Sequence, residues 1–382
     1  MPVTESFQPS WDDGRWTALP RLYEEIRADV CVVGLGGSGL TAIEALLDEG
    51  ISVVGIDAAG VANGAAGRNG GFLLAGLARF HHEMVEHLGR ERATALYQLT
   101  MAEIDRIAQV EAAQVRRCGS LRIAVDAAEL ADCEAQLAAL LADGLPAQRY
   151  SGPEGQGLLI PTDASFNPLL RCRSLATSVR ARGAQLFEST PAVTIERGRI
   201  ETPHGRILAG RIVVAVDGKL DQVLPELRDQ VRTARLQMLG TAPTDEVEFT
   251  RPVYARYGFD YWQQTTDHRV VIGGFRDTQL DAEWTAHTDV TQAIQQRLEQ
   301  QLRERLGVTA PITHRWAASV GYTVDGMPIL GEVRPGIWAL GGYNGTGNIV
   351  GALCARAVVD LILQGRSTFA AMISSVHKRN DP

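Results

Sequence analysis

The sequence predicts an α/β fold, and three observations near its start carry this prediction. Residues 29–33 form a short, almost entirely apolar run, which is typical of a strand covered on both faces in a parallel sheet. A glycine-rich turn follows at once, and apolar residues then recur at helical spacing as far as Gly50. Residues 51–56 predict a second strand that ends on Asp57. This order of strand, turn, helix and strand predicts a Rossmann-like domain.

The turn after the first strand has the spacing used by dinucleotide-binding proteins. Its Gly-x-Gly-x-x-Gly pattern permits a tight turn, close approach of a pyrophosphate, and close packing of the helix on the strand. The helix start offers free N–H groups to phosphates, and the acid after the second strand is placed to accept hydrogen bonds from ribose hydroxyls. A purely structural turn is the alternative. The expected cofactor contacts here are Gly34, Gly36, Gly37, Ser38, Gly39, Asp57 and Ala58.

Composition and charge argue against several classes of protein. The 382 residues are enough for two to three domains. The formal net charge of −8 argues against a nucleic-acid partner, because phosphate binding requires clustered Lys and Arg. No apolar stretch approaches the ~18 residues of a membrane span, and residues 1–29 lack the pattern of a signal peptide. We therefore expect a soluble, cytoplasmic protein.

The cysteines and histidines predict neither disulfides nor a metal centre. The five cysteines are an odd number and include no Cys-x-x-Cys pair, so we expect reduced thiols. The eight histidines show no ligand spacing beyond the adjacent His81 and His82. We place these two on a solvated helix face.

A long loop of glycine and small residues, 58–71, follows the second strand, where a nicotinamide-binding fold usually continues into another helix. Residues 64–71, Gly-Ala-Ala-Gly-Arg-Asn-Gly-Gly, resemble the Gly-Ala-Ser-Gly-Arg-Asn-Gly-Gly loop of the D-amino-acid oxidase superfamily of FAD enzymes. The similarity is to its γ-glutamylputrescine oxidoreductase and glycine oxidase-like branch. In that family the loop runs along the pyrophosphate and reaches the flavin. The resemblance implies FAD contacts at Ala66, which replaces a serine, and at Gly67, Arg68, Asn69, Gly70 and Gly71.

Two later segments extend the resemblance over most of the chain. Residues 183–218 look like the family's adenine-side hairpin and its following buried strand. Residues 321–348 resemble the closing FAD motif, which ends in a glycine-rich turn and a helix from about residue 349 to 363. Free N–H groups at that helix start would stabilise negative charge on the reduced flavin. The implied FAD contacts are Val193 (to adenine), Ala215, Asp217, Gly218, Gly342, Gly345, Thr346, Gly347 and Asn348.

These motifs divide the chain into two domains. An FAD-binding domain is expected from residues 28–80, 155–225 and 318–370. A discontinuous α+β substrate domain, with a mixed antiparallel sheet plus helices, is expected from residues 81–154 and 226–317. Residues 1–27 would form an N-terminal arm and residues 371–382 a C-terminal tail.

The resemblance also implies the reaction. In the family, a hydride passes from the carbon bearing an amine to flavin N5, and the resulting imine is hydrolysed; oxygen commonly reoxidises the flavin. A neutral amine requires no acid or base, so we expect an aromatic wall over the flavin. On strand alternation within residues 254–262, Tyr257, Phe259 and Tyr261 share one face. Tyr257 and Tyr261 are the main candidates, with Trp262 and Tyr343 behind them, although these residues would also suit a simple packing face.

Three absences narrow the expected substrate. Val320 stands where amino-acid-oxidising relatives carry a carboxylate-binding arginine, residues 319–321 lack the cysteine that attaches FAD covalently in sarcosine oxidases, and Val271 replaces their oxygen-activating lysine. We expect noncovalent FAD, an amine without a carboxylate next to the reacting carbon, and oxygen or another electron acceptor. The candidates for binding a distal carboxylate are Arg235, Arg256 and His268.

Two other functions stay open on the sequence. The missing lysine and arginine would suit a flavin-bound structural or regulatory subunit. The first glycine motif alone would suit an NAD-linked dehydrogenase. The sequence determines neither the amine nor the oligomeric state.

Overall fold

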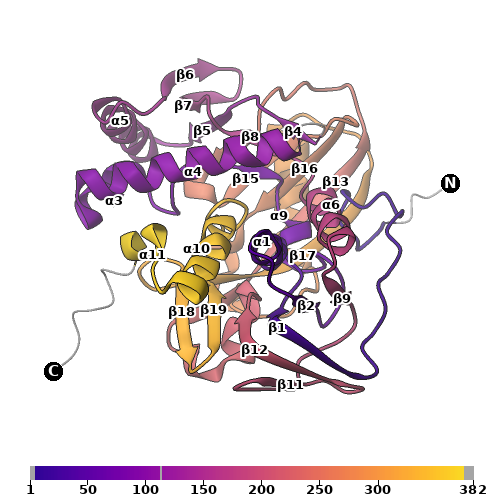
Figure 1. Ribbon diagram of the computed structural model, residues 1–382. Helices are drawn as coiled ribbons and strands as arrows, with labels where there is room; N and C mark the ends of the chain where they lie inside the picture. Colours follow the sequence, from indigo (N-terminus) through magenta and orange to yellow (C-terminus); the bar gives the residue numbers. More distant parts are fainter. Residues whose placement is uncertain (1–4, 112–113, 374–382) are drawn as a thin grey trace. The chain divides into compact units, whose positions relative to one another are not determined.

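The computed structural model describes residues 5–111 and 114–373, and the chain forms two compact units (Figure 1). Unit 1 consists of Met1–Asp13, Arg68–Pro168 and Ala234–Ser319, and unit 2 of Gly14–Gly67, Leu169–Thr233 and Val320–Pro382. The tail expected over residues 371–382 lies largely outside the described residues. No helix in the described ranges has the length and apolar character needed to cross a membrane.

Unit 2 is built on an eight-stranded sheet whose order is β10-β11-β12-β1-β2-β9, with β19 paired to β12 and β18 to β19. The pairs β9–β2, β2–β1, β1–β12 and β12–β19 are all parallel. The carboxyl ends of these strands therefore meet at one edge of the sheet, as the α/β prediction requires. The strands are β1 (Glu25–Val33), β2 (Val53–Ile56), β9 (Gln185–Phe187), β10 (Thr194–Glu196), β11 (Arg199–Glu201), β12 (Arg206–Val214), β18 (Ile329–Arg334) and β19 (Ile337–Gly341).

Two long helices of unit 2 follow glycine-rich turns and pack on each other. Helix α1 (Gly37–Asp48) connects β1 to β2, and α10 (Val350–Gln364) follows β19, where the sequence predicts a helix. Figure 1 shows α1 and α10 next to each other, and the two helices are in contact. The remaining helices are α6 (Pro168–Ala181), α7 (Leu220–Val223), α11 (Thr368–Ile373) and the 3-10 turns η1 (Asp217–Lys219) and η2 (Pro225–Leu227). Along the chain, α2 (Ala65–Arg68) contains the last residue of one segment of unit 2, Gly67, and the first residue of a segment of unit 1, Arg68.

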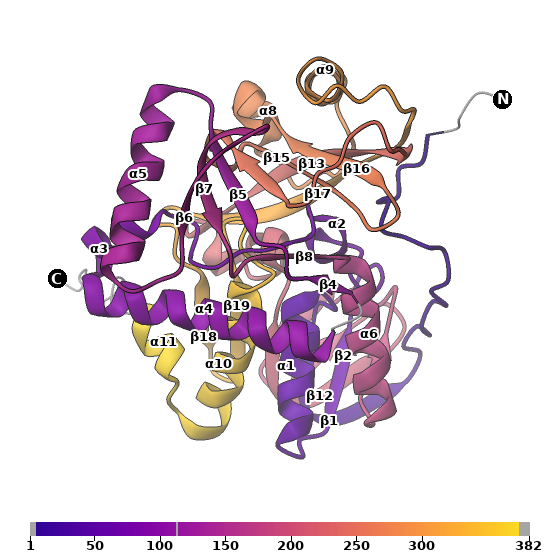
Figure 2. The same cartoon turned by 90° about the horizontal axis from the view of Figure 1, so that it is seen from above.

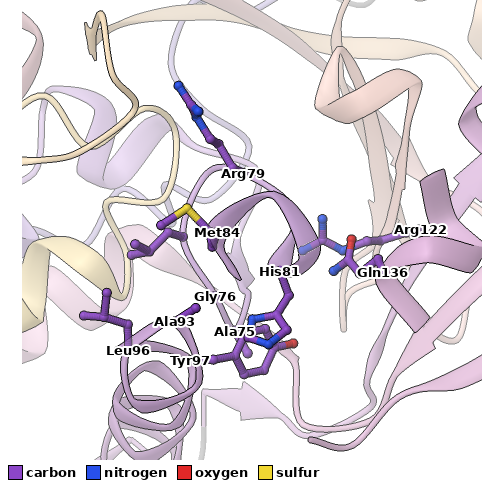
Figure 3. A pocket seen from close by; sticks show the side chains of 11 residues that line it. Ala75, Gly76, Arg79, His81, Met84, Ala93, Leu96, Tyr97, Arg122 and Gln136 are labelled. Carbon is purple, nitrogen blue, oxygen red and sulfur yellow. The ribbon is translucent and has the colours of Figure 1, made fainter. Parts of the chain in front are cut away.

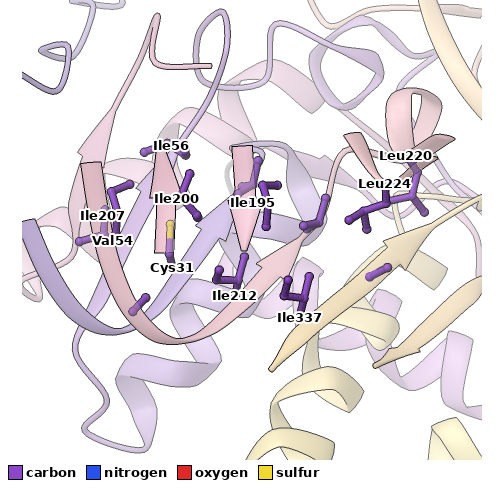
Figure 4. Close-up of a cluster of buried hydrophobic side chains, with 14 of the residues drawn as sticks. Cys31, Val54, Ile56, Ile195, Ile200, Ile207, Ile212, Leu220, Leu224 and Ile337 are labelled. Carbon is purple, nitrogen blue, oxygen red and sulfur yellow. The ribbon is translucent and has the colours of Figure 1, made fainter. Parts of the chain in front are cut away.

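Figure 4 shows a cluster of buried hydrophobic side chains that belongs to the core of unit 2. Alternate residues of the central strands point into it, among them Cys31 of β1, Val54 and Ile56 of β2, and Ile212 of β12. Leu220 and Leu224 close the cluster from α7 and the residue after it. Burial of each Val, Ile or Leu side chain contributes about 1.5–3 kcal/mol, so these strands specify the sheet and its register.

Unit 1 contains a large mixed sheet and a small one. The large sheet has the order β17-β13-β16-β15-β14-β5-β7-β6, and the small one the order β3-β8-β4. In the large sheet the pair β14–β5 is parallel, and the pairs β13–β16, β15–β16, β14–β15, β5–β7 and β6–β7 are antiparallel. The pairs β3–β8 and β4–β8 of the small sheet are also antiparallel. The strands are β3 (Phe72–Leu73), β4 (Val115–Arg116), β5 (Ser120–Ala124), β6 (Gln148–Gly152), β7 (Gly155–Ile160), β8 (Ala164–Phe166), β13 (Val231–Pro243), β14 (Val253–Ala255), β15 (Asp260–Gln264), β16 (Arg269–Gly274) and β17 (Ile312–Thr323).

The helices of unit 1 fall in the two segments that the sequence assigns to the substrate domain. Figure 2 shows α5 beside the strands β5, β6 and β7, on which it packs. Gly89, which has a φ of +83°, separates α3 from α4. The helices are α3 (His81–Leu88), α4 (Arg90–Val110), α5 (Ala127–Ala142), α8 (Leu280–Glu283), α9 (Gln292–Gln300), the 3-10 turns η3 (Arg256–Gly258) and η4 (Arg276–Gln279), and the π-helical turn η5 (Gln301–Arg305).

Three expectations from the sequence are corrected by the fold. Residues 68–80 and 155–168 belong to unit 1, because β8 pairs with both β3 and β4. His81 is not solvated: it is 3% exposed and its Nε2 lies 2.7 Å from a carboxylate oxygen of Asp143. The aromatic run 254–262 is not one strand, because Arg256 and Tyr257 adopt positive φ angles and separate β14 from β15.

Candidate cofactor and substrate sites

The turn between β1 and α1 has the backbone geometry of an anion site. Gly34 has a φ of +105°, and a Cβ atom there would overlap the carbonyl oxygen of Ala215. A Cβ atom on Gly39 would overlap the carbonyl oxygen of Gly34, so both positions require glycine. The N-cap Gly36 offers no side-chain hydrogen bond, and the first turn of α1 contains no acidic residue. The helix start therefore presents backbone N–H groups and a positive dipole.

A buried arginine, which the sequence analysis missed, lies beside this helix start. Arg171 of α6 is 3% exposed, and its Nη1 is 3.5 Å from the position that a Cβ atom on Gly37 would occupy. Within the described residues Arg171 makes no hydrogen bond or ion pair. A buried guanidinium without a partner is costly, so this arrangement favours an anion at the helix start. A charged residue among the leucines of 169–175 was the available sequence signal.

Asp57, the acid expected to contact ribose, also organises the glycine turn. Its Oδ2 accepts a 2.8 Å hydrogen bond from the N–H of Leu35, and its Oδ1 accepts one of 2.8 Å from the N–H of Ala59. Burial raises the pKa of Asp57, and these two hydrogen bonds oppose the rise. Asp57 thus ties the glycine turn to the following loop, while its ribose contact stays a prediction.

Glu188, the residue after β9, is a second buried carboxylate of unit 2. It is 4% exposed and accepts hydrogen bonds from the backbone N–H groups of Leu19 and Val61, each 2.6 Å long. It also accepts a 3.0 Å hydrogen bond from the indole N–H of Trp16. The N-terminal arm and the loop after β2 are therefore held by one side chain.

The loop 64–71 is held in unit 1 at its second half. Trp11 Nε1 donates a 3.0 Å hydrogen bond to the carbonyl of Asn69, whose own Oδ1 accepts one of 2.9 Å from the N–H of Gly71. The side-chain amide of Gln263 donates to the carbonyls of Gly70 and Gly71. Because Gln263 is 2% exposed, these bonds fix the loop backbone firmly.

The other predicted loop residues have mixed surroundings. The Arg68 guanidinium donates a 3.3 Å hydrogen bond to the carbonyl of Ala317 and a 3.2 Å bond to Gln8 Oε1, and burial lowers its pKa. Ala66 lies 3.3 Å from the position of a Cβ atom on Gly36, so it borders the glycine turn. Gly67 belongs to the single helical turn α2 and is buried. The FAD contacts of these residues stay predictions.

On the adenine side, the structure leaves less of the backbone open than the sequence suggests. The Val193 N–H donates to the carbonyl of Glu201 at 2.8 Å, so only its carbonyl remains for a hydrogen bond with adenine. The Gly218 carbonyl accepts a 2.7 Å bond from Thr233 Oγ1. Ala215 donates its N–H to the carbonyl of Val33 at 2.8 Å and is 5% exposed.

The closing segment of unit 2 is held by Asp217. This residue has a φ of +40°, and its carboxylate accepts hydrogen bonds of 3.2 Å from the N–H groups of Gly321 and Tyr343. Burial raises the pKa of Asp217 to about 6, against the effect of these bonds. Asp217 therefore positions the turn that carries Gly342, Gly345, Thr346, Gly347 and Asn348 before α10.

The turn before α10 resembles the one before α1 in its lack of capping. The N-cap Ile349 supplies no side-chain hydrogen bond, and the first turn of α10 contains no acidic residue. The hydroxyl of Thr346 donates to the carbonyl of Tyr343 at 2.7 Å. The Tyr343 side chain is 4% exposed and fills the space above Gly347 and Gly351, so it has a packing position inside unit 2. Its assignment to a substrate wall is not supported by this geometry.

Of the predicted aromatic wall in unit 1, only Tyr261 lies against the glycine-rich loop. Its ring is 3.1 Å from the position of a Cβ atom on Gly70. It stacks on Tyr254, with ring centroids 6.4 Å apart, and Phe72 meets both rings at an angle. These three rings, Phe72, Tyr254 and Tyr261, are called the aromatic cluster below.

The other two aromatic candidates have different positions. Tyr257 is 51% exposed, and its hydroxyl donates a 2.5 Å hydrogen bond to Asp132, which raises the pKa of Tyr257 to about 12. Trp262 is 1% exposed and belongs to the hydrophobic core of unit 1. The expected shared face of Tyr257 and Tyr261 is therefore wrong, because η3 interrupts the strand between them.

The three residues expected to bind a distal carboxylate already have acidic partners. Arg235 makes bonds of 2.9 and 2.8 Å to the two carboxylate oxygens of Glu283. Arg256 pairs with Asp260 and Asp277. The remaining candidate, His268, lies 2.6 Å from a carboxylate oxygen of Asp245. Arg235 and Arg256 are therefore neutralised by acidic side chains of unit 1, whereas the contact between His268 and Asp245 lies on the exposed surface.

A parallel sheet with a glycine-rich turn, an uncapped helix and an acid after the second strand defines a dinucleotide-binding protein. The sequence profile of the family described as FAD dependent oxidoreductase matches residues 29–361, and the chain belongs to this family. It is therefore an enzyme of the FAD-dependent oxidoreductase class, with FAD as its cofactor.

Individual known proteins agree with this assignment. The chain is 26% identical over 399 residues to gamma-glutamylputrescine oxidoreductase of Escherichia coli (strain K12), covering 95% of this chain and 90% of that protein. It is 28% identical over 369 residues to the probable oxidoreductase OrdL of Rhizobium meliloti (strain 1021), covering 90% and 84%. The crystal structure of glycine oxidase from Geobacillus kaustophilus has the same fold, with a TM-score of 0.74 at 18% identity over 90% of this chain and 96% of that chain.

Proposed function

We propose that this protein oxidises a C–N bond of a small amine or amino-acid derivative with a noncovalently bound FAD. The observation that carries the cofactor part is the uncapped start of α1 beside the buried, unpaired Arg171. The activities for which gamma-glutamylputrescine oxidoreductase and glycine oxidase are named support an amine as the substrate. The aromatic cluster beside Gly70 supports a water-poor place for that amine.

The residues of unit 2 fit an FAD. The N–H groups at the start of α1 and the Arg171 guanidinium would hold the pyrophosphate, because both offer donors without an internal acceptor. Asp57 keeps the glycine turn in shape and has lone pairs left for ribose hydroxyls. Asp217 holds the second glycine-rich turn through two backbone N–H groups.

Bound FAD supplies the redox chemistry, since its isoalloxazine accepts a hydride from the carbon next to the amine nitrogen. The protein's part is to position the amine and to exclude water. Tyr261, which is 8% exposed, and Phe72, also 8% exposed, present apolar ring surface beside Gly70 and Gly71. Such surface favours the neutral amine over the ammonium ion, because desolvation penalises the charged form. Oxygen or another electron acceptor and a cytoplasmic location are parts of the same proposal.

The first test is the flavin content of the purified protein and its response to amines. We expect a yellow protein that releases FAD on denaturation and whose absorbance near the flavin maximum bleaches without oxygen when a suitable amine is added. A colourless protein from flavin-replete cells would contradict the proposal. A yellow protein that no amine bleaches would instead favour a flavin-bound structural or regulatory subunit.

The second test addresses Arg171 directly. The Arg171→Met variant should bind FAD about 10- to 100-fold more weakly, because a charged hydrogen bond is worth about 1.5–3 kcal/mol. The matched control Arg180→Met removes an exposed arginine from the last turn of the same helix and should bind FAD as the unchanged protein does. FAD titration of the two apoproteins, followed by flavin fluorescence, measures the effect. Equal affinities in both variants would place the pyrophosphate elsewhere.

A further inference from the structure

Among the described residues of unit 1, the guanidinium of Arg122, at the end of the aromatic cluster, forms no ion pair. Arg122 is the central residue of β5, where Leu121 and Ile123 point into the core of the unit. Its Nε is buried and has no hydrogen-bond partner among the described residues, and no ion pair involves its guanidinium there. The nearby carboxylate of Asp163 accepts hydrogen bonds from Ser120 Oγ at 2.6 Å and from the Ala75 N–H at 2.8 Å instead.

Two aromatic rings flank this guanidinium. Its Cζ lies 5.3 Å from the ring centroid of Phe80 and 5.9 Å from that of Tyr254. Cation–π contact of this kind covers the flat faces of a guanidinium and stabilises its charge. It leaves the in-plane N–H groups available, and their fork geometry matches the two oxygens of a carboxylate.

Arg122 also lines a pocket in which other polar atoms lack partners (Figure 3). Tyr97 and Gln136, which are 4% and 1% exposed, border the same pocket. The Tyr97 hydroxyl and the Gln136 Oε1 are buried without a hydrogen-bond partner in the part of the chain that is described. Buried polar atoms are nearly always hydrogen-bonded, so three such groups around one pocket indicate a bound polar group. At about 10 Å³ the pocket has room for a group of the size of a water molecule or one carboxylate oxygen.

Arg122 is the residue that the pocket and the aromatic cluster have in common, since none of the three rings lines the pocket. Tyr254 contacts Arg122 on one side and stacks on Tyr261 on the other, and Tyr261 lies against Gly70. A substrate with its C–N bond beside Tyr261 would extend along Tyr254 to the guanidinium. The contact between Tyr261 and Tyr254 and the contact between Tyr254 and Arg122 together separate the reacting carbon from the guanidinium. The charged group of the substrate must therefore lie several bonds from the reacting carbon.

We infer that Arg122 binds a carboxylate at the far end of the substrate, so that the substrate class is an amine carrying a distal carboxylate. This inference rests on the proposed function for the oxidised C–N bond, and the carboxylate site itself rests on the contacts of Arg122 alone. Arg122 thereby replaces Arg235, Arg256 and His268 as the residue expected to bind a distal carboxylate.

The first experiment measures carboxylate binding without any oxidation. Butanoate, pentanoate and hexanoate are each compared with the amide of the same length by calorimetry on the FAD-loaded protein. At least one acid should bind about 10-fold or more tightly than its amide, because only the carboxylate forms charge-assisted bonds to Arg122. Arg122→Met should abolish this preference, and Arg122→Lys, which keeps a charge but lacks the planar fork, should retain part of it.

Arg305→Met is the matched control, because Arg305 also lies over an aromatic ring of unit 1, with its Cζ 5.3 Å from the Trp262 ring centroid, but does not line the pocket. This variant should keep the preference for the acid. Equal binding of acids and amides by the unchanged protein, or a preference that survives Arg122→Met in a protein with unchanged thermal midpoint, overturns the assignment. If Arg122→Met does not fold, Arg122→Lys replaces it, and a preference for the acid as large as that of the unchanged protein then overturns the assignment.

The second experiment joins the site to the reaction. Anaerobic flavin bleaching by 5-aminopentanoate and 6-aminohexanoate is compared with bleaching by pentylamine and hexylamine. The amino acids should reach half-saturation at about 10-fold lower concentration in the unchanged protein and lose this advantage in Arg122→Met, with similar limiting rates for the plain amines. Binding of acids through Arg122 without bleaching by any amine would reject the proposed oxidation and retain the carboxylate site. Bleaching by amines without an Arg122-dependent preference for the amino acids would retain the proposed oxidation and reject the carboxylate site.

Discussion

Asp163 gives the sharpest prediction about stability. It is fully buried after β7, and it links the loop at Ala75 to the start of β5 at Ser120, on either side of the Arg122 pocket. Burial raises its pKa from 3.8 to about 6, and the bonds from Ser120 and Ala75 and the charge of Arg122 only partly oppose this. Below pH 3.8 the carboxyl is protonated in both folded and unfolded chains. Between pH 3.8 and about 6 only the folded chain keeps the proton.

The sign of the effect follows from proton binding. Because the folded state binds more protons in this window, the free energy of unfolding falls as pH rises and levels off above pH 6. The difference of about two pKa units corresponds to about 3 kcal/mol, of which about 2 kcal/mol falls between pH 4.5 and 7.5. Asp163→Asn removes the titration and resembles the protonated acid in shape.

The assay is urea unfolding of the FAD-loaded protein and of Asp163→Asn at several pH values between 4.5 and 7.5, followed by tryptophan fluorescence. The unfolding free energy of the natural protein minus that of the variant should fall by about 2 kcal/mol across this range. Taking the difference cancels all other titrating groups. A flat difference, or one that rises with pH, would refute the argument, since a rise would mean that the folded carboxyl has a lowered pKa.

Four further variants, one of them a control, test unit 2. Gly39→Ala places a methyl group on a backbone oxygen and should prevent FAD retention, whereas Gly64→Ala, which meets no atom within 4 Å, should leave the amount of FAD per protein unchanged. Glu188→Ala leaves three donors without an acceptor and should lower the free energy of unfolding by about 3 kcal/mol or more in a denaturation experiment; an unchanged midpoint would exclude its structural role. Asp57→Ala should weaken FAD binding by about 1–3 kcal/mol in an equilibrium titration, and unchanged affinity would mean that the adenosine end is misplaced.

Local rules account for the parts of the fold that the sequence predicts well. The strand, turn and helix around Gly34 and Gly39 depend on backbone sterics between near neighbours and on apolar periodicity, and both are visible in the sequence. The start of helix α5 (Ala127–Ala142) follows a local rule of the same kind, because the Asp126 side chain caps it. The prediction of one alternating strand over residues 254–262 is wrong because positive φ angles at Arg256 and Tyr257 interrupt the strand. Neither position carries a glycine or proline that would indicate the interruption in the sequence.

What the sequence by itself determined is the class of fold, the dinucleotide turn and the similarity to FAD enzymes, because each depends on short-range spacing. Only the tertiary structure decided which charges are free. Arg235, Arg256 and His268 meet their acidic partners through the fold, while Arg122 and Arg171 meet none in the described residues. Whether a guanidinium is neutralised depends on residues brought together from distant parts of the chain, and a one-dimensional pattern does not contain that information.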